Sequence, residues 1–219
     1  MNGNNKNARK VFGVIIVAGV LAALYGAASN SPPQSALGTV PASTQASAAP
    51  APAPAPEEPP MTKAEAAQAL STYMLQVHAQ FFANSVLQQV IHGRIRQALE
   101  FRDLAKFQKG AEDLKESVMA MQNRVTMLPY PNNLEDQDQA AFDQVAERVS
   151  DVTGGMVEIA VDVAAAAHTG LDFTKEAEKD ARELEKASAA MRKAAMAAYK
   201  QFGIAASKID KKDLTIIDK

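Results

Sequence analysis

The chain has 219 residues, no cysteine, no tryptophan and a formal net charge of −2 at pH 7. Residues 61–219 contain 20 Lys and Arg against 23 Asp and Glu. They therefore lack the basic surplus, interleaved with aromatic residues, that nucleic-acid binding requires. The sequence predicts no nucleic-acid partner, and the lack of cysteine excludes disulfides and thiol catalysis.

An uncharged apolar run, residues 11–28, follows a basic N-terminus, residues 1–10. At about 1.5 Å per residue it spans about 27 Å, close to the hydrocarbon thickness of a bilayer. No Lys or Arg follows the run before Lys63, so the basic flank orients the N-terminus toward the cytoplasm. We expect a single-pass anchor in the inner (cytoplasmic) membrane, with the bulk of the chain in the periplasm. A cleaved signal peptide is the alternative, because residues 26–28 are small.

Residues 29–60 form a Pro/Ala-rich linker that holds nine of the eleven prolines. Alternating proline favours extended polyproline II at about 3.1 Å per residue, a reach of up to about 95 Å. We expect this linker to act as a spacer that lets the following domain work away from its own membrane.

Residues 61–209 are predicted to form an all-α, antiparallel helical bundle, with residues 210–219 as a tail. Thr62 and Glu65 match the capping box that begins a helix. Strong helix formers dominate after it and alternation of period two is nearly absent, so no sheet is expected. Gly170 suits a left-handed helix cap, and Asp172 suits the N-cap of a last helix.

Apolar residues recur with helical spacing along three stretches, which predicts buried stripes on three long helices. The first stripe is Leu104, Phe107, Ala111, Leu114, Val118, Met121, Val125 and Leu128. The second is Val145, Val149, Val152, Met156, Ile159, Val163 and Ala166. The third is Leu184, Ser188, Met191, Ala195, Ala198, Phe202, Ala205 and Ile209.

The stretch before residue 104 loses its periodicity, first near residues 84–85 and again near residues 100–102. A break at His92-Gly93 would give four helices of similar length and an up-down-up-down bundle, which is the favoured arrangement. The alternative is three helices, with one long bent helix over residues 62–128.

Two glycines, Gly154 and Gly155, fall in the middle of the third predicted helix, where each costs about 1 kcal/mol relative to Ala. We expect them to permit close packing of a neighbouring backbone, with a kink as the alternative. Glu158 and Asp162 stand one turn apart and are expected on a solvated face.

No catalytic, cofactor-binding or metal-binding residues are predicted. The three histidines, His78, His92 and His168, have no helical spacing that would let them share a metal. The methionines near residue 121 could hold copper(I), but methionine is a common filler of cores. No nucleophile motif, phosphate loop or dinucleotide fingerprint occurs.

The function expected from this organisation is a non-catalytic interaction or scaffold protein of a bacterial cell envelope. Its partner would be another envelope protein or a second copy, engaged through helix-in-groove or coiled-coil contacts. The alternatives are a periplasmic bundle that binds a small ligand, metal or haem, and a membrane-acting or exclusion-type helical protein. Candidate contact residues are Phe81, Phe82, Phe101 and Phe107, although a bundle core suits each of them.

Overall fold

A computed structural model describes residues 59–131, 133–170 and 174–217 of the chain. Four long helices make up most of it, followed by a short 3-10 helix and a two-stranded antiparallel sheet. The elements are α2 (Lys63–Glu100), α3 (Leu104–Thr126), α4 (Asp136–Thr169), α5 (Thr174–Gln201), η1 (Ala206–Lys208), β1 (Ile209–Asp210) and β2 (Thr215–Ile216). The anchor, the linker and Asp172 lie outside the described residues.

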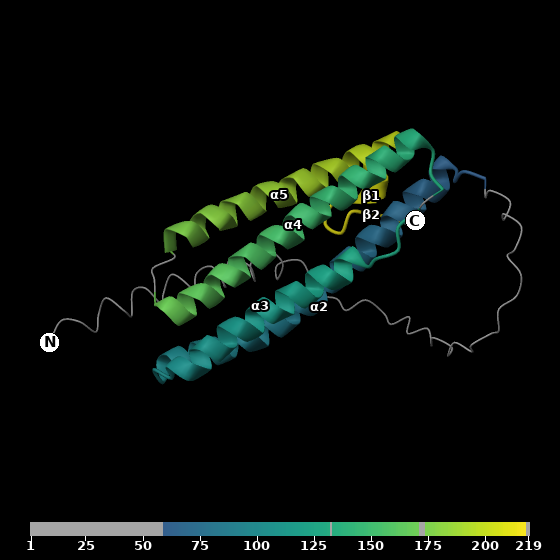
Figure 1. Cartoon of the computed structure of the whole chain (residues 1–219). Helices are drawn as coiled ribbons and strands as arrows, with labels where there is room; N and C mark the ends of the chain where they lie inside the picture. Colours follow the sequence, from purple (N-terminus) through teal and green to yellow (C-terminus); the bar gives the residue numbers. More distant parts are fainter. Residues whose placement is uncertain (1–58, 132, 171–173, 218–219) are drawn as a thin grey trace, which may run out of the picture.

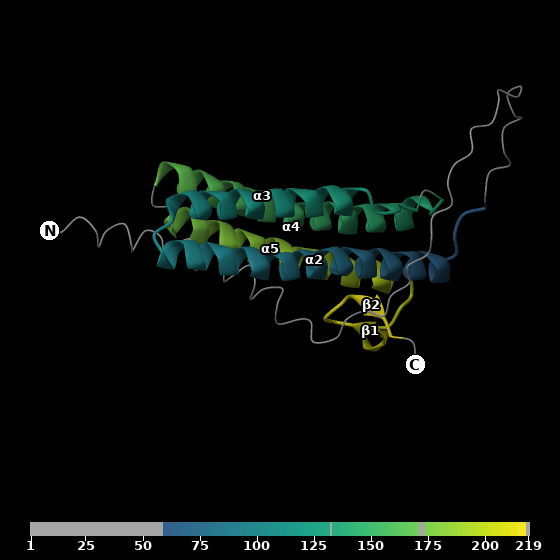
Figure 2. The same ribbon diagram turned by 90° about the horizontal axis from the view of Figure 1, so that it is seen from below.

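Successive helices run antiparallel, which gives the up-down-up-down bundle (Figure 1). α3 packs against both α2 and α4, and α4 packs against α5, whereas α2 and α5 contact each other little. The β-hairpin lies beside α2 and α5 near one end of the bundle (Figure 2). One continuous apolar core joins the four helices to the hairpin.

The capping box at the start of α2 is confirmed. The Thr62 hydroxyl accepts from the Glu65 amide, while the Glu65 carboxylate accepts from the Thr62 amide at 2.8 Å. The end of α4 is also confirmed, because Gly170 adopts φ 67° and its amide donates to the Ala166 carbonyl. Both ends satisfy backbone groups that a helix otherwise leaves unpaired.

The break between the first two helices lies at residues 101–103, next to the second loss of periodicity at residues 100–102 and not at His92-Gly93, the position considered for four helices of similar length. The Asp103 amide donates to the Ala98 carbonyl at 2.8 Å, and the Arg102 amide donates to the Leu99 carbonyl at 3.1 Å. This is a Schellman motif in which Arg102, with φ 55°, stands where glycine is usual. Asp103 then caps α3 by accepting from the Lys106 amide. α2 therefore has 38 residues and α3 has 23.

The last helix ends at Gln201, before the predicted limit of its stripe at Ile209. Gly203 adopts φ 81°, and the Ile204 amide donates to the Tyr199 carbonyl, which closes the helix with a second Schellman motif. The chain then turns back to form the β-hairpin, so the expectation that no sheet would form is wrong.

The hairpin is held against the helices by long-range contacts. The Tyr199 hydroxyl donates to the Leu214 carbonyl at 2.7 Å, and the Ile216 amide donates to the Ser71 hydroxyl at 3.0 Å. Leu214 and Ile209 are buried in the core. Residues 210–217, expected as a tail, thus pack against the bundle.

The predicted stripes are largely buried, as expected for a helical bundle. All residues of the second stripe lie in the core, and the first is buried from Phe107 to Val125, with Leu104 exposed beside the turn at its start. In the third stripe Ala205 is exposed, because it follows the end of α5.

Close packing of a glycine occurs at Gly110 and not at Gly154 or Gly155. A Cβ added at Gly110 would lie 2.6 Å from Cγ1 of Ile95, so α2 and α3 approach closely there. A Cβ added at Gly155 would lie 3.5 Å from Leu184 Cδ1, which is an ordinary van der Waals contact. A Cβ added at Gly154 would lie 4.0 Å from its nearest neighbour. The close approach expected at the glycine pair is therefore wrong.

Candidate interaction surface on helix α2

The four predicted contact phenylalanines divide between core and surface. Phe81 and Phe107 are buried in the bundle core. Phe82 is half-buried on the outer side of α2, and Phe101 is 72% exposed at the turn after it. Only Phe82 and Phe101 are placed where a partner could touch them.

Phe82 lies within a longer apolar stripe on the outward face of α2. We define the α2 stripe as Leu75, Ala79, Phe82, Val86 and Val90, whose spacing of 4-3-4-4 keeps them on one side of a helix. Leu75, Val86 and Val90 are 53%, 48% and 52% exposed. The core-facing residues Leu70, Met74, Val77, Phe81 and Ile95 occupy the opposite side. α2 is thus apolar on both faces, although only one of them is covered by the bundle.

The α2 stripe also lies in a stretch without charge. From Ala66 to Gly93 the sequence contains no Asp, Glu, Lys or Arg, whereas such residues make up 22% of the chain. An exposed helix face is normally charged or polar. The uncharged stretch is a sequence signal that singles out this helix, whereas the predicted aromatic contacts do not include Leu75, Val86 or Val90.

Beneath the stripe, α2 carries buried polar side chains. Asn84 and Gln88 are 1% and 2% exposed. Neither polar atom of the Asn84 amide has a hydrogen-bond partner among the described residues, and neither does Nε2 of Gln88. A buried amide without a partner costs about 1–3 kcal/mol. We therefore expect these two side chains to destabilise the middle of α2.

Two histidines on α2 are held neutral by their surroundings. Burial lowers the pKa of His78, an effect that the Asp213 carboxylate 3.8 Å from its Nδ1 partly opposes. Burial and the nearby Arg96 lower the pKa of His92. The uncharged character of α2 thus includes its histidines at neutral pH.

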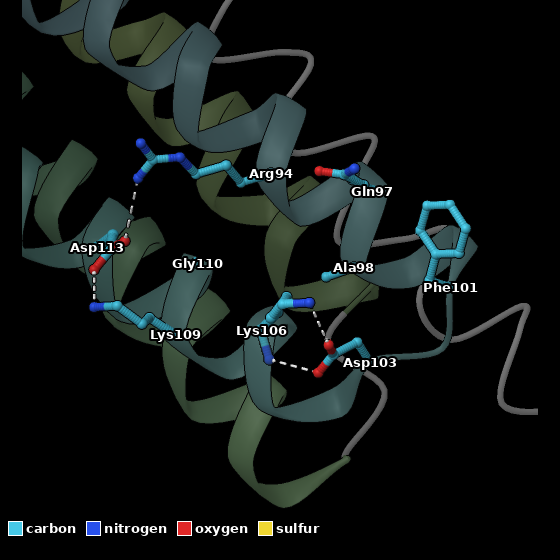
Figure 3. A pocket seen from close by; sticks show the side chains of 9 residues that line it. All are labelled: Arg94, Gln97, Ala98, Phe101, Asp103, Lys106, Lys109, Gly110 and Asp113. Atoms are coloured by element: carbon cyan, nitrogen blue, oxygen red, sulfur yellow. Dashed lines mark hydrogen bonds and ion pairs between the residues drawn. The ribbon is translucent and has the colours of Figure 1, made fainter.

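A pocket of about 240 Å³ lies between the end of α2 and the start of α3 (Figure 3). Arg94 and Lys109 approach the Asp113 carboxylate at 4.0 and 3.0 Å, and Lys106 pairs with Asp103 at 2.9 Å. These cations are largely exposed and each already faces a carboxylate. The pocket therefore has no buried, free charge that would select an anion.

The acidic pair expected on a solvated face is divided between two environments. Glu158 is exposed, whereas Asp162 is half-buried and faces Asp180 across the α4–α5 contact. Partial burial and the Asp162 carboxylate raise the pKa of Asp180.

His168 lies on the surface with its Nε2 3.2 Å from Glu112 Oε1. Among the described residues no three His, Asp or Glu side chains gather as a metal site would require.

The methionines considered for copper are also separated. Met121 is buried in the core, while Met119 and Met127 are exposed.

Within residues 59–217, apart from the undescribed positions, no helix combines the length and apolar character that a membrane span needs. The predicted anchor at residues 11–28 lies outside that range.

Comparison with known proteins returned no match: no protein-family model, curated protein or solved structure is similar to the chain.

Proposed function

We propose that this chain is a single-pass envelope protein whose helical bundle acts as a non-catalytic interaction module in the periplasm. The proposal joins the predicted anchor and Pro/Ala-rich spacer to the outward face of α2. The anchor and spacer would keep the bundle in the periplasm while letting it reach a partner.

The exposed, uncharged α2 stripe is the observation that carries this proposal. Leu75, Val86 and Val90 expose large apolar side chains along one helix face, where solvation alone would favour charges. A helix face of this kind is suited to contact with another helix or to an apolar groove. Bundle stability does not explain it, because the core of α2 lies on its other side.

Site-specific photo-crosslinking in the native cells tests this proposal. A photoreactive residue in place of Val86 should produce discrete adducts of full-length protein, identified by mass spectrometry. The matched control replaces Ala189, which is exposed on α5, and should produce none. Absence of adducts from position 86, or equal adducts from both positions, would contradict an interaction module that works through α2.

A second candidate function is binding of a small polar ligand inside the bundle. Asn84 and Gln88 favour it, because each has buried polar atoms without a partner in the described part of the chain, and a bound molecule could satisfy such atoms. Full-length protein purified in detergent would then show a stoichiometric bound molecule in native mass spectrometry. The variant Asn84→Leu would lose that molecule, whereas protein that is always free of ligand would rule this candidate out.

A further inference from the structure

We infer that the occupant of the α2 stripe is a second copy of this chain, packed antiparallel along α2. This inference rests on the proposed function and names its partner. Two properties of the stripe support it, its lack of charge and its extent.

The lack of charge decides what kind of surface can cover the stripe. A partner that presents charged side chains to residues 66–93 would bury them without an opposite charge, which costs several kcal/mol. The partner surface must therefore be uncharged over the same length. A second copy supplies such a surface from its own α2, at a concentration equal to that of the first copy.

The stripe from Leu75 to Val90 covers about 23 Å of helix, and the uncharged stretch around it, residues 66–93, is long enough for a weak dimer. The uncharged stretch covers about 40 Å of helix, and a contact strip about 10–12 Å wide has an area of roughly 400–500 Å² on each copy. Two copies would bury roughly 800–1,000 Å² in total, which is below the usual size of stable interfaces and fits a weak one. Anchoring both copies in one membrane would raise their effective concentration and favour such a dimer.

The spacing of large and small side chains specifies the arrangement. With a two-fold axis between Phe82 and Ala83, Leu75 meets Val90 of the second copy and Ala79 meets Val86. The bulky Leu75 and Val90 then face each other at both ends of the contact. Between each end and the axis, the small Ala79 faces the larger Val86. A two-fold interface requires this kind of self-complementarity.

The position of the two-fold axis predicts which residues of the two copies lie close enough to be linked. Near the axis, Ala83 of each copy would lie offset from its equivalent by only about 1.5 Å along the helix, whereas Ala79 would be offset by about 10 Å. The offset of the Ala79 pair alone exceeds the Cα separation that a disulfide permits, whereas the offset of the Ala83 pair is compatible with it. Both alanines are exposed, and the chain contains no cysteine that could react instead.

The experiment compares Ala83→Cys, Ala79→Cys and Ala189→Cys in full-length protein in native membranes, under mild oxidation. We expect a disulfide-linked dimer from Ala83→Cys and monomer from the other two variants. Circular dichroism of each purified variant checks that its helical content is unchanged. Linking through both Ala83→Cys and Ala79→Cys would overturn the antiparallel register, and no linking at all would overturn the dimer.

The photo-crosslinking described above separates failure of this inference from failure of the proposed function. If position 86 links to a different envelope protein and Ala83→Cys stays monomeric, the second copy is wrong and the interaction module stands. If position 86 links to nothing and Ala83→Cys stays monomeric, both proposals fall.

Discussion

Helices α2 and α5 belong to the same bundle and lie beside the same β-hairpin (Figure 2). Their exposed faces differ in charge. α5 exposes many charged side chains, some of them in pairs one turn apart, such as Lys179–Glu183 and Glu178–Arg182. α2 exposes Leu75, Val86 and Val90 within a stretch that has no charge. α5 shows that a helix of this bundle can have a charged outer face, so the apolar outer face of α2 needs a reason other than folding.

The largest expected effect comes from charging the outer face of α2. Val86→Lys combined with Val90→Glu should weaken self-association at least a hundredfold, or about 2.7 kcal/mol, since each charge would be buried in the dimer contact. The free energy of unfolding should change by no more than about 0.5 kcal/mol, because both positions are on the surface. Sedimentation equilibrium of full-length protein in detergent measures the first quantity, and chemical denaturation measures the second.

The matched control for this change is Ala189→Lys with Ala197→Glu on the exposed face of α5. It adds the same charges to a face that is already charged, so association should not change. Equal weakening by both pairs of substitutions would show that the difference between the helices has no role in association.

An added methyl group should destabilise the bundle at the inner face of α2 but not at its outer face. Gly110→Ala on α3 places a methyl group against Ile95 of α2. The net effect should be a free energy of unfolding lower by about 1–2 kcal/mol, because the cost of overpacking exceeds the gain in helix propensity from replacing glycine by alanine. Gly93→Ala on the outer face of α2 meets nothing within 4 Å and should raise stability by about 1 kcal/mol.

Urea unfolding followed by circular dichroism measures both glycine variants. In an Ile95→Ala background the added methyl group has room, so Gly110→Ala should there become stabilising. If it remained destabilising, contact with Ile95 would not be its cause.

Removing the buried polar layer should stabilise α2. Asn84→Leu combined with Gln88→Met removes three buried polar atoms that have no partner among the described residues, both amide atoms of Asn84 and Nε2 of Gln88, and replaces the side chains by apolar ones of similar size. We expect the free energy of unfolding to rise by about 1 kcal/mol, because a desolvation cost disappears. A loss of stability would mean that a bound water or ligand satisfies these amides in solution.

Most of the helical fold is predictable because its signals are local. The capping box at Thr62 and the left-handed cap at Gly170 are readable from a few neighbouring residues, and the stripes of α3 and α4 follow one period. The loss of periodicity near residues 100–102 indicates the turn at residues 101–103, but no turn sequence marks it, because Arg102, not glycine, adopts the left-handed conformation there. The hairpin was missed because contacts such as Ile216 with Ser71, far apart in sequence, hold it in place.

The interaction surface is only partly predictable for a different reason. Phe82 was identified, but α2 has apolar residues on two opposite faces, so its periodicity does not reveal which face is covered by the bundle. Phe81 and Phe107 fall in the core and Leu75 and Val90 fall outside it. Only the packing of α2 against α3 and the hairpin distinguishes them. The missing charges at residues 66–93 would have marked the helix, though not the face.

Acidification should destabilise the protein through the histidines of α2. Because burial lowers the pKa of His78 and His92, the unfolded chain binds protons more readily than the folded one. Their contribution to stability is therefore full above the ordinary pKa of 6.5 and is lost as the pH falls through the lowered values. The double variant with His78→Gln and His92→Gln should lose less of its free energy of unfolding than the natural chain as the pH falls from 7.5 to 5.5, measured by urea unfolding. An unchanged pH dependence would contradict this role.

On α5 the effect of acid on the free energy of unfolding has the opposite sign, and it is the smallest effect that we expect. Partial burial and Asp162 raise the pKa of Asp180, so the folded state holds that proton more tightly than the unfolded chain does. Ionised Asp180 therefore weakens the fold at pH 7, and this loss fades as the pH falls through the raised pKa toward the ordinary value of 3.8. Asp180→Asn should raise the free energy of unfolding at pH 7 by about 0.3 kcal/mol, the size expected for surface charges.

The control for Asp180→Asn is Asp151→Asn, which removes the partner of Arg148 at 2.7 Å and should lower stability by a similar amount. Urea unfolding of both variants at pH 7 and pH 3.5 measures these changes, and the gain from Asp180→Asn should shrink at the lower pH, where Asp180 is protonated in the folded state. Acid would then weaken α2, where neutral histidines are buried, and relieve α5, where a carboxylate is crowded by another. A gain from Asp180→Asn that persisted at pH 3.5 would instead point to packing of the amide as its cause.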